Sequence, residues 1–204
     1  YNDLKDYNQA IPNFLQAVEI YEKLRRTAKG EVRRDFFANM MSSYTGLSSS
    51  YINVNDFQGA YNTIELSRAK LFAERLAESD SLVSIPDLIE VQSSLSSNQA
   101  IVIYANVGWE NLIEMVITND TIISIEVPDS VLLATLYPDN EEATIELAIK
   151  SYRNSIKFFA ETEKLTEFGR VFFDYLIQPV ENHIQDKTDL LIIPDGILGY
   201  LPFE

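Results

Sequence analysis

The chain has 204 residues, 46% hydrophobic and 11% aromatic, which is enough apolar material for one or two packed cores and unlike a disordered segment. A formal net charge of −15 disfavours nucleic-acid binding, which needs a basic surface against the phosphates. The absence of cysteine excludes a disulfide framework and thiol catalysis within these residues.

The chain begins with Tyr1 and not with Met, so we expect it to be part of a longer protein. No apolar run approaches the ~20 residues that a membrane-spanning helix needs, and we expect no membrane segment in this chain and a cytoplasmic location.

The charge is distributed unevenly. No Lys or Arg lies between Arg75 and Lys150, although acidic residues such as Glu114 and Asp129 are frequent there. We interpret this stretch as a solubilising surface, with an electronegative rim for a basic peptide or partner as the alternative. The basic residues between Lys23 and Arg34 are interpreted as a solvated helix end.

The first third of the chain has the spacing of a tetratricopeptide repeat. Tyr44, Leu47, Ser48 and Tyr51 occupy its first-helix positions, and Ala60 and Ile64 follow in the same register. We therefore predict helices over residues 8–25, 33–53 and 57–78, the last two antiparallel with Ala60 against Ser48 or Leu47. A generic helical hairpin with an aromatic core is the alternative.

An earlier half repeat shows the same spacing, in Tyr7, Ala10, Phe14 and Ala17. The two copies are offset by more than the ~34-residue repeat period. This offset indicates long helices or an insertion around residues 27–35.

The pattern changes after residue 84. Ser84 and Pro86 resemble a helix start, which predicts a short helix through Leu95. Three runs rich in Ile and Val follow, at residues 100–107, 112–118 and 121–127, with polar residues such as Glu114 and Glu126 at alternate positions. Asn119 and Asp120 form a two-residue link typical of a tight hairpin. We predict a three-stranded antiparallel meander.

Residues 139–184 are predicted to be helical. Asp139 and Glu142 resemble a capping pair, and apolar residues recur at helical spacing from Ile145 to Phe159. A second helix runs to Pro179 and a shorter one carries Val180 to Ile184. Their dense aromatic stripe indicates core packing, and we expect it to cover one face of a sheet.

The last fifteen residues read LLIIPDGILGYLPFE. The unbroken run from Leu190 to Ile193 is typical of a strand buried on both faces, as in a parallel sheet covered by helices. Pro194, Asp195 and Gly196 end that strand. We expect the meander to extend the sheet that this strand begins, and the domain to be unfinished at Glu204.

This string, preceded by TEFGRVFFDYLIQPVENHIQDKTD, resembles the entry motif of the CHAT domain, a caspase-like cysteine peptidase domain associated with tetratricopeptide repeats and related to separase. The resemblance covers roughly residues 67–204. It implies a mixed α/β fold with a tetratricopeptide-like region over residues 1–77 and a truncated caspase-like domain over residues 78–204. It also implies that the catalytic His and Cys lie beyond Glu204.

The sequence contains no catalytic or cofactor-binding motif of a serine hydrolase, a P-loop protein, a Rossmann protein or a zincin. The single histidine, His183, stands beside acidic residues near a helix end and is interpreted as a surface residue. We therefore name no catalytic, cofactor-binding or metal-binding residue in this chain and expect no cofactor.

Two functions remain open. The chain is either the amino-terminal part of a repeat-coupled cysteine endopeptidase, whose helices bind a protein or peptide partner, or a non-catalytic scaffold with a degenerate caspase-like domain. In either case the segment alone should cleave no peptide, because it lacks a thiolate nucleophile.

Overall fold

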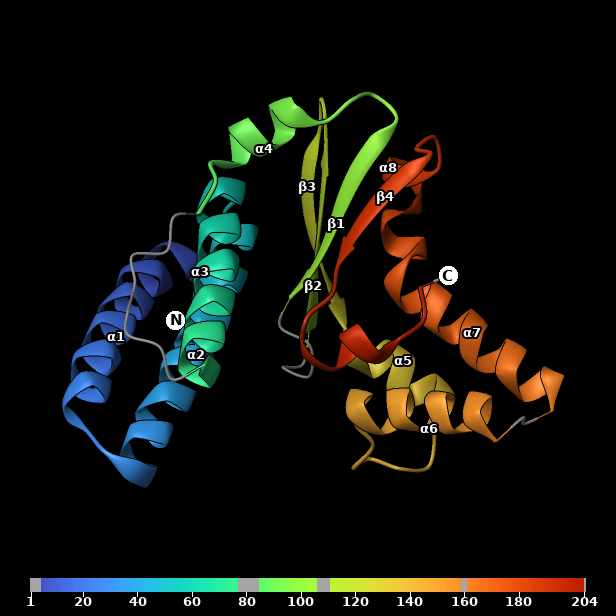
Figure 1. Cartoon of the computed structure of the whole chain (residues 1–204), viewed down its shortest axis with the longest axis horizontal. Helices are drawn as coiled ribbons and strands as arrows, with labels where there is room; N and C mark the ends of the chain where they lie inside the picture. The colour runs from blue at the N-terminus through green and yellow to red at the C-terminus, as the bar shows by residue number, and fades with distance from the viewer. Residues whose placement is uncertain (1–4, 77–84, 106–110, 159–160, 204) are drawn as a thin grey trace. The chain divides into compact units, whose positions relative to one another are not determined.

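A computed structural model describes residues 5–76, 85–105, 111–158 and 161–203 (Figure 1). The chain is a mixed α/β protein and divides into two compact units, Tyr1–Val91 and Gln92–Glu204. The domain boundary expected between residues 77 and 78 lies outside the described residues.

The first unit contains three long helices, α1 (Tyr7–Thr27), α2 (Gly30–Asn53) and α3 (Phe57–Leu76). The three predicted helices are thus confirmed, apart from residues 77–78, which lie outside the described part. Only Ala28 and Lys29 separate α1 from α2, because Gly30 at φ 58° makes the turn there. The offset between the two half repeats therefore comes from long helices. No strand lies among the described residues of this unit.

Small residues let these helices approach closely. A Cβ added to Gly46 of α2 would collide with the ring of Phe14 on α1, and one added to Gly59 of α3 would lie 2.7 Å from the ring of Tyr51 on α2. Ala60, which was expected to lie against Ser48 or Leu47, is fully buried, and the residue before it, Gly59, also lies close to α2. An ion pair between Lys70 and Glu22, 3.3 Å apart, links α3 to α1.

The second unit is built on a four-stranded sheet in the order β3-β2-β1-β4. Its strands are β1 (Gln99–Ala105), β2 (Asn111–Thr118), β3 (Ile122–Pro128) and β4 (Asp189–Ile193). The first three form an antiparallel meander, and β4 adds to β1 in parallel, so the predicted meander and its extension by the last strand are confirmed. In the β2–β3 turn, Thr118 Oγ1 donates to Asp120 and accepts from the backbone N–H of Thr121.

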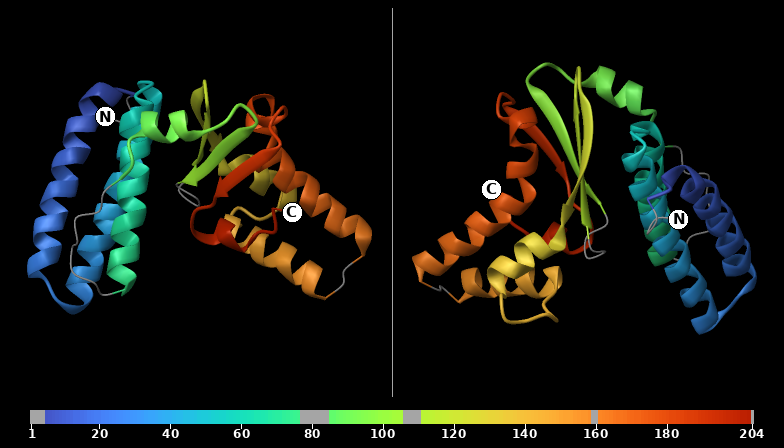
Figure 2. Two further views of the ribbon diagram at one scale, coloured as in Figure 1. Left: turned by 45° about the horizontal axis from the view of Figure 1, so that its top comes forward. Right: turned by 180° about the vertical axis from the view of Figure 1, so that it is seen from behind.

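Helices cover one face of this sheet. They are α5 (Asp129–Leu136), α6 (Ile145–Lys157) and α7 (Thr162–Leu176), followed by the short helices η1 (Gln178–Val180) and α8 (Glu181–Ile184). Figures 1 and 2 show α5, α6 and α7 together on the same side of the strands. Their apolar side chains join those of the sheet, such as Val102 and Val116, in one core, as the aromatic stripe of α7 predicted.

Two predicted helix starts are wrong. Helix α4 (Leu88–Ser94) is capped by Asp87, whose carboxylate accepts from the N–H of Ile89 at 2.8 Å, so Pro86 lies before the helix. Helix α6 is capped by Thr144, which accepts from the N–H of Leu147, and not by the Asp139 and Glu142 pair. In both helices the capping residue is the polar residue directly before the first helical residue.

The expected burial of the final strand on both faces is also wrong. Leu190 and Leu191 are 43% and 57% exposed. The reason is the position of β4, which has β1 on one side and is an edge strand of the described sheet.

Candidate functional site

Four polar side chains gather where β1 and β3 end. They come from four different elements: Tyr104 from β1, Glu114 from β2, Asp129 from the start of α5 and Tyr175 from α7. All four are buried, with exposed fractions of 7% or less. We call them the buried polar cluster.

The strand register places Glu114 in this cluster. Glu114 lies opposite Tyr104 in the β1–β2 pair, and its neighbours two residues away, Leu112 and Val116, pack in the core beneath the helices. Because alternate residues of a strand share a face, the Glu114 carboxyl also lies on the helix-covered face.

The two tyrosines are held by hydrogen bonds. Tyr104 Oη donates to the backbone carbonyl of Leu176 at 2.6 Å, and Tyr175 Oη donates to Asp129 Oδ1 at 2.5 Å. These bonds attach α7 to β1 and to the start of α5. They therefore fix the end of α7 against the sheet.

Glu114 differs from the others because neither of its carboxyl oxygens has a hydrogen-bond partner among the described residues. Burial raises the pKa of Glu114 to about 9, because removal from water disfavours the charged form. Glu114 is therefore protonated at neutral pH. The interpretation of the acidic stretch as a solubilising surface is wrong for Glu114 and Asp129, which are core residues. Most other described acids of the stretch, such as Glu90 and Glu142, are exposed.

The same environment keeps the tyrosines neutral. Burial is the main cause that raises the pKa of Tyr104, and the charge of Glu114 would raise it further. For Tyr175, burial raises the pKa most, followed by the hydrogen bond to Asp129 and the Asp129 charge, and the charge of an ionised Glu114 would raise it further. Neither phenol can serve as a base or nucleophile near neutral pH.

The buried polar cluster can therefore hold one proton and orient α7, but it presents no nucleophile. His183, the only histidine, is exposed on α8, as expected from the sequence. Within the described residues, no group of His, Asp and Glu side chains could hold a metal ion.

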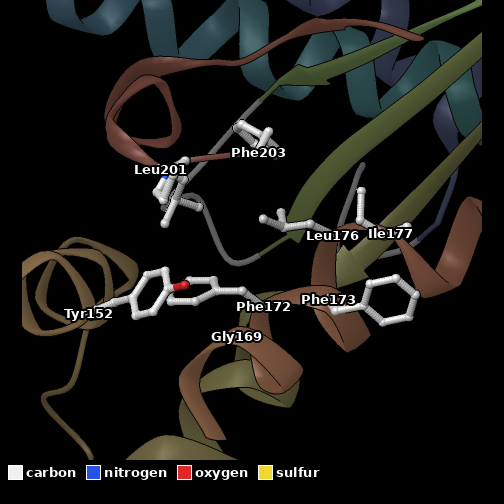
Figure 3. Close-up of a pocket in the computed structure, with 9 residues that line it drawn as sticks. Tyr152, Gly169, Phe172, Phe173, Leu176, Ile177, Leu201 and Phe203 are labelled. Carbon is white, nitrogen blue, oxygen red and sulfur yellow. The ribbon is translucent and has the colours of Figure 1, made fainter. Parts of the chain in front are cut away.

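A separate apolar cavity of about 240 Å³ lies between α6, α7 and the last described residues. Figure 3 shows the rings of Tyr152 and Phe172 on one side and Leu201 and Phe203 on the other. The Tyr152 and Phe172 ring centroids are 5.4 Å apart, and the Phe203 ring stacks on Tyr104 at 5.9 Å. The final segment, including the short helix η2 (Gly196–Tyr200), thus forms one wall of the cavity.

No family model matches the chain, and no curated protein or solved structure matches it either. In the part of the chain that the structure describes, none of the helices combines the length and the apolar composition that a membrane span requires.

The sequence did not reveal the buried polar cluster. The sequence showed Glu114 and Glu126 only as polar residues at alternate positions of their strands. Glu114 pairs with Ile125 and Glu126 with Ile113 across β2 and β3, so the two carboxyls lie on opposite faces. The one sequence feature that pointed to burial of Glu114 is that both of its neighbours in the chain, Ile113 and Met115, are apolar.

Proposed function

We propose that this chain is the amino-terminal part of a repeat-coupled, caspase-like cysteine endopeptidase. One observation carries the proposal: β4, which holds the LLII run that begins the LLIIPDG motif, pairs in parallel with β1 while the helices between them cover one face of the sheet. Parallel strands joined through helices are the unit of open α/β sheets, whose active sites lie at the carboxyl ends of the strands.

The helical unit supplies the partner-binding part of this proposal. Its repeat-like helices leave apolar side chains exposed on α1, including Leu15 at 47% and Ile20 at 47%. Such side chains suit the docking of a protein or peptide segment. A cytoplasmic location belongs to the same proposal.

Catalysis in this proposal needs a Cys thiolate activated by a His. The His would take the thiol proton, and the thiolate would attack the scissile carbonyl. The chain contains no cysteine, so the proposal places the nucleophile in a part of the parent protein beyond Glu204.

The second candidate is a non-catalytic scaffold. It is favoured by the burial of the polar groups nearest the strand ends, where Tyr104 and Tyr175 hold structural hydrogen bonds. In this case the sheet domain would serve as an interaction module.

A peptide-library digest with the full-length parent protein, read by mass spectrometry, separates the two candidates. We expect cleavage that is abolished by thiol alkylation, and no cleavage by the 204-residue segment alone. Absence of cleavage by the parent would support the scaffold. Cleavage by the segment alone that survives alkylation would contradict both.

A further inference from the structure

The end of α6 and the final segment form an exposed apolar surface. Ile156 and Tyr200, which line one hollow of this surface, and Phe173 of α7, which lines the adjoining one, are between 42% and 58% exposed. Clustered apolar exposure of this kind marks interaction sites more often than isolated apolar residues do. We call this surface, together with the cavity of Figure 3, the α6–tail surface.

The α6–tail surface contains two hollows that share Leu201 and Pro202. The first is the aromatic cavity, and the second is lined by residues that include Arg153, Lys157 and Tyr200. The aromatic cavity, at about 240 Å³, is smaller than the roughly 300–1,000 Å³ of small-molecule sites. Its size suits one bulky apolar side chain better than a whole small ligand.

The charge around the second hollow is opposite to that of the protein. No acidic residue lines either hollow, although the chain carries 31 acidic residues against 16 basic ones. Arg153 and Lys157 form no ion pair with any described residue, whereas Lys150 on the same helix pairs with Glu146 at 2.7 Å.

Aromatic rings orient the two cations. The Arg153 guanidinium lies 4.7 Å from the centroid of the Tyr200 ring, and Lys157 Nζ lies 5.4 Å from that of Phe158. These contacts hold the charged groups without neutralising them. The combination of an apolar cavity and two unneutralised cations is complementary to an anchor that is both apolar and acidic.

From this geometry we infer that the α6–tail surface binds an acidic peptide segment of a partner protein, with one bulky apolar side chain in the aromatic cavity and neighbouring carboxylates on Arg153 and Lys157. The inference does not depend on peptidase activity, although Tyr200, Leu201 and Pro202 belong to the string that carries the family resemblance. If the protein cleaves nothing but still binds the peptide, the proposed function fails and this inference stands.

The test uses the full chain and a short fluorescein-labelled peptide with one Phe flanked by Glu residues, and it measures anisotropy. We expect saturable binding that weakens with salt. Replacing the Phe of the peptide by Ala, or its Glu residues by Lys, should abolish saturation. Binding that does not depend on the Phe or on the acidic residues would overturn the inference.

Two pairs of variants locate the site. Arg153→Glu with Lys157→Glu should weaken binding roughly tenfold at low salt, whereas Lys150→Glu with Lys164→Glu, which makes the same change in net charge outside the hollows, should leave it within about twofold. An equal loss of peptide affinity in both pairs of variants would mean that binding depends only on net charge. It would contradict the placement of the site at Arg153 and Lys157.

The cavity is tested at Gly169, which lines it. A Cβ at this position would meet only Tyr152 Oη, at 3.8 Å, so Gly169→Ala should fold and bind normally. Gly169→Leu should fill the cavity and reduce binding roughly tenfold. Unchanged binding by the Leu variant, or binding to anionic phospholipid vesicles but not to the peptide, would contradict the assignment.

Discussion

At the scale of single residues, the most unusual feature is a buried carboxyl group with no hydrogen-bond partner among the described residues. A buried acid without hydrogen bonds costs stability once it ionises, and Glu114 avoids that cost by keeping its proton. Tyr104 and Tyr175 nearby are satisfied by hydrogen bonds, so Glu114 is the one member of the buried polar cluster without a hydrogen-bond partner among the described residues.

Glu114 should make stability depend on pH. Its pKa is raised to about 9 in the folded state and lies near ~4.3 in the unfolded chain. The folded state therefore binds more protons between these values, and the free energy of unfolding should fall as pH rises through this window, by up to about 1.4 kcal/mol per pH unit.

Glu114→Gln removes this titration. Urea unfolding of both proteins at pH 5.5, 7 and 8.5 should show that the variant gains stability relative to the wild type as pH rises, since all other groups titrate alike in both. A constant difference between the two proteins at all three pH values would show that the native Glu114 titrates normally.

At the scale of elements, local polar residues decide where the helices begin. Asp87 and Thr144 accept from backbone N–H groups in the first turns of α4 and α6. A capping residue satisfies donors that have no partner inside the helix. The acidic residues before α6 resemble caps in sequence but lie in the turn that precedes it.

Thr144→Ala should lower the free energy of unfolding by about 1 kcal/mol, because the N–H of Leu147 loses its side-chain acceptor. Asp139→Ala should change it by less than about 0.5 kcal/mol, because Asp139 is exposed and lies outside the helix. Chemical denaturation of the two variants compares them directly. A larger loss of unfolding free energy in the Asp139 variant than in the Thr144 variant would show that Asp139 and Glu142 cap the helix after all.

At the scale of the whole molecule, the sheet of the second unit offers an apolar edge. β4 exposes Leu190 and Leu191 and pairs on one side with β1. The backbone groups on the other side have no strand to bond among the described residues. Exposed edges of this kind can pair with strands of other chains.

Leu191→Lys should reduce self-association of the chain, because a charge on an edge strand opposes strand pairing. Its effect on stability should stay within about 0.5 kcal/mol, since the side chain is 57% exposed. Sedimentation velocity over a range of concentrations measures the change. Val131→Lys on α5, of similar exposure at 53%, is the control and should leave association unchanged.

The sequence by itself determined most of the helices and the antiparallel meander, but not helix α5 or the starts of α4 and α6. Helical spacing around Tyr44 and Ala60 predicted the helices, and the Asn119-Asp120 link with its flanking Ile and Val runs predicted the meander, because these signals act over a few neighbouring residues. Only the tertiary structure decided which acids are buried and which leucines are exposed. The burial of Glu114 depends on strand register and on helices that lie far away in the chain. The exposure of Leu191 depends on the place of its strand at the edge of the sheet. Neither property is encoded in the neighbouring residues.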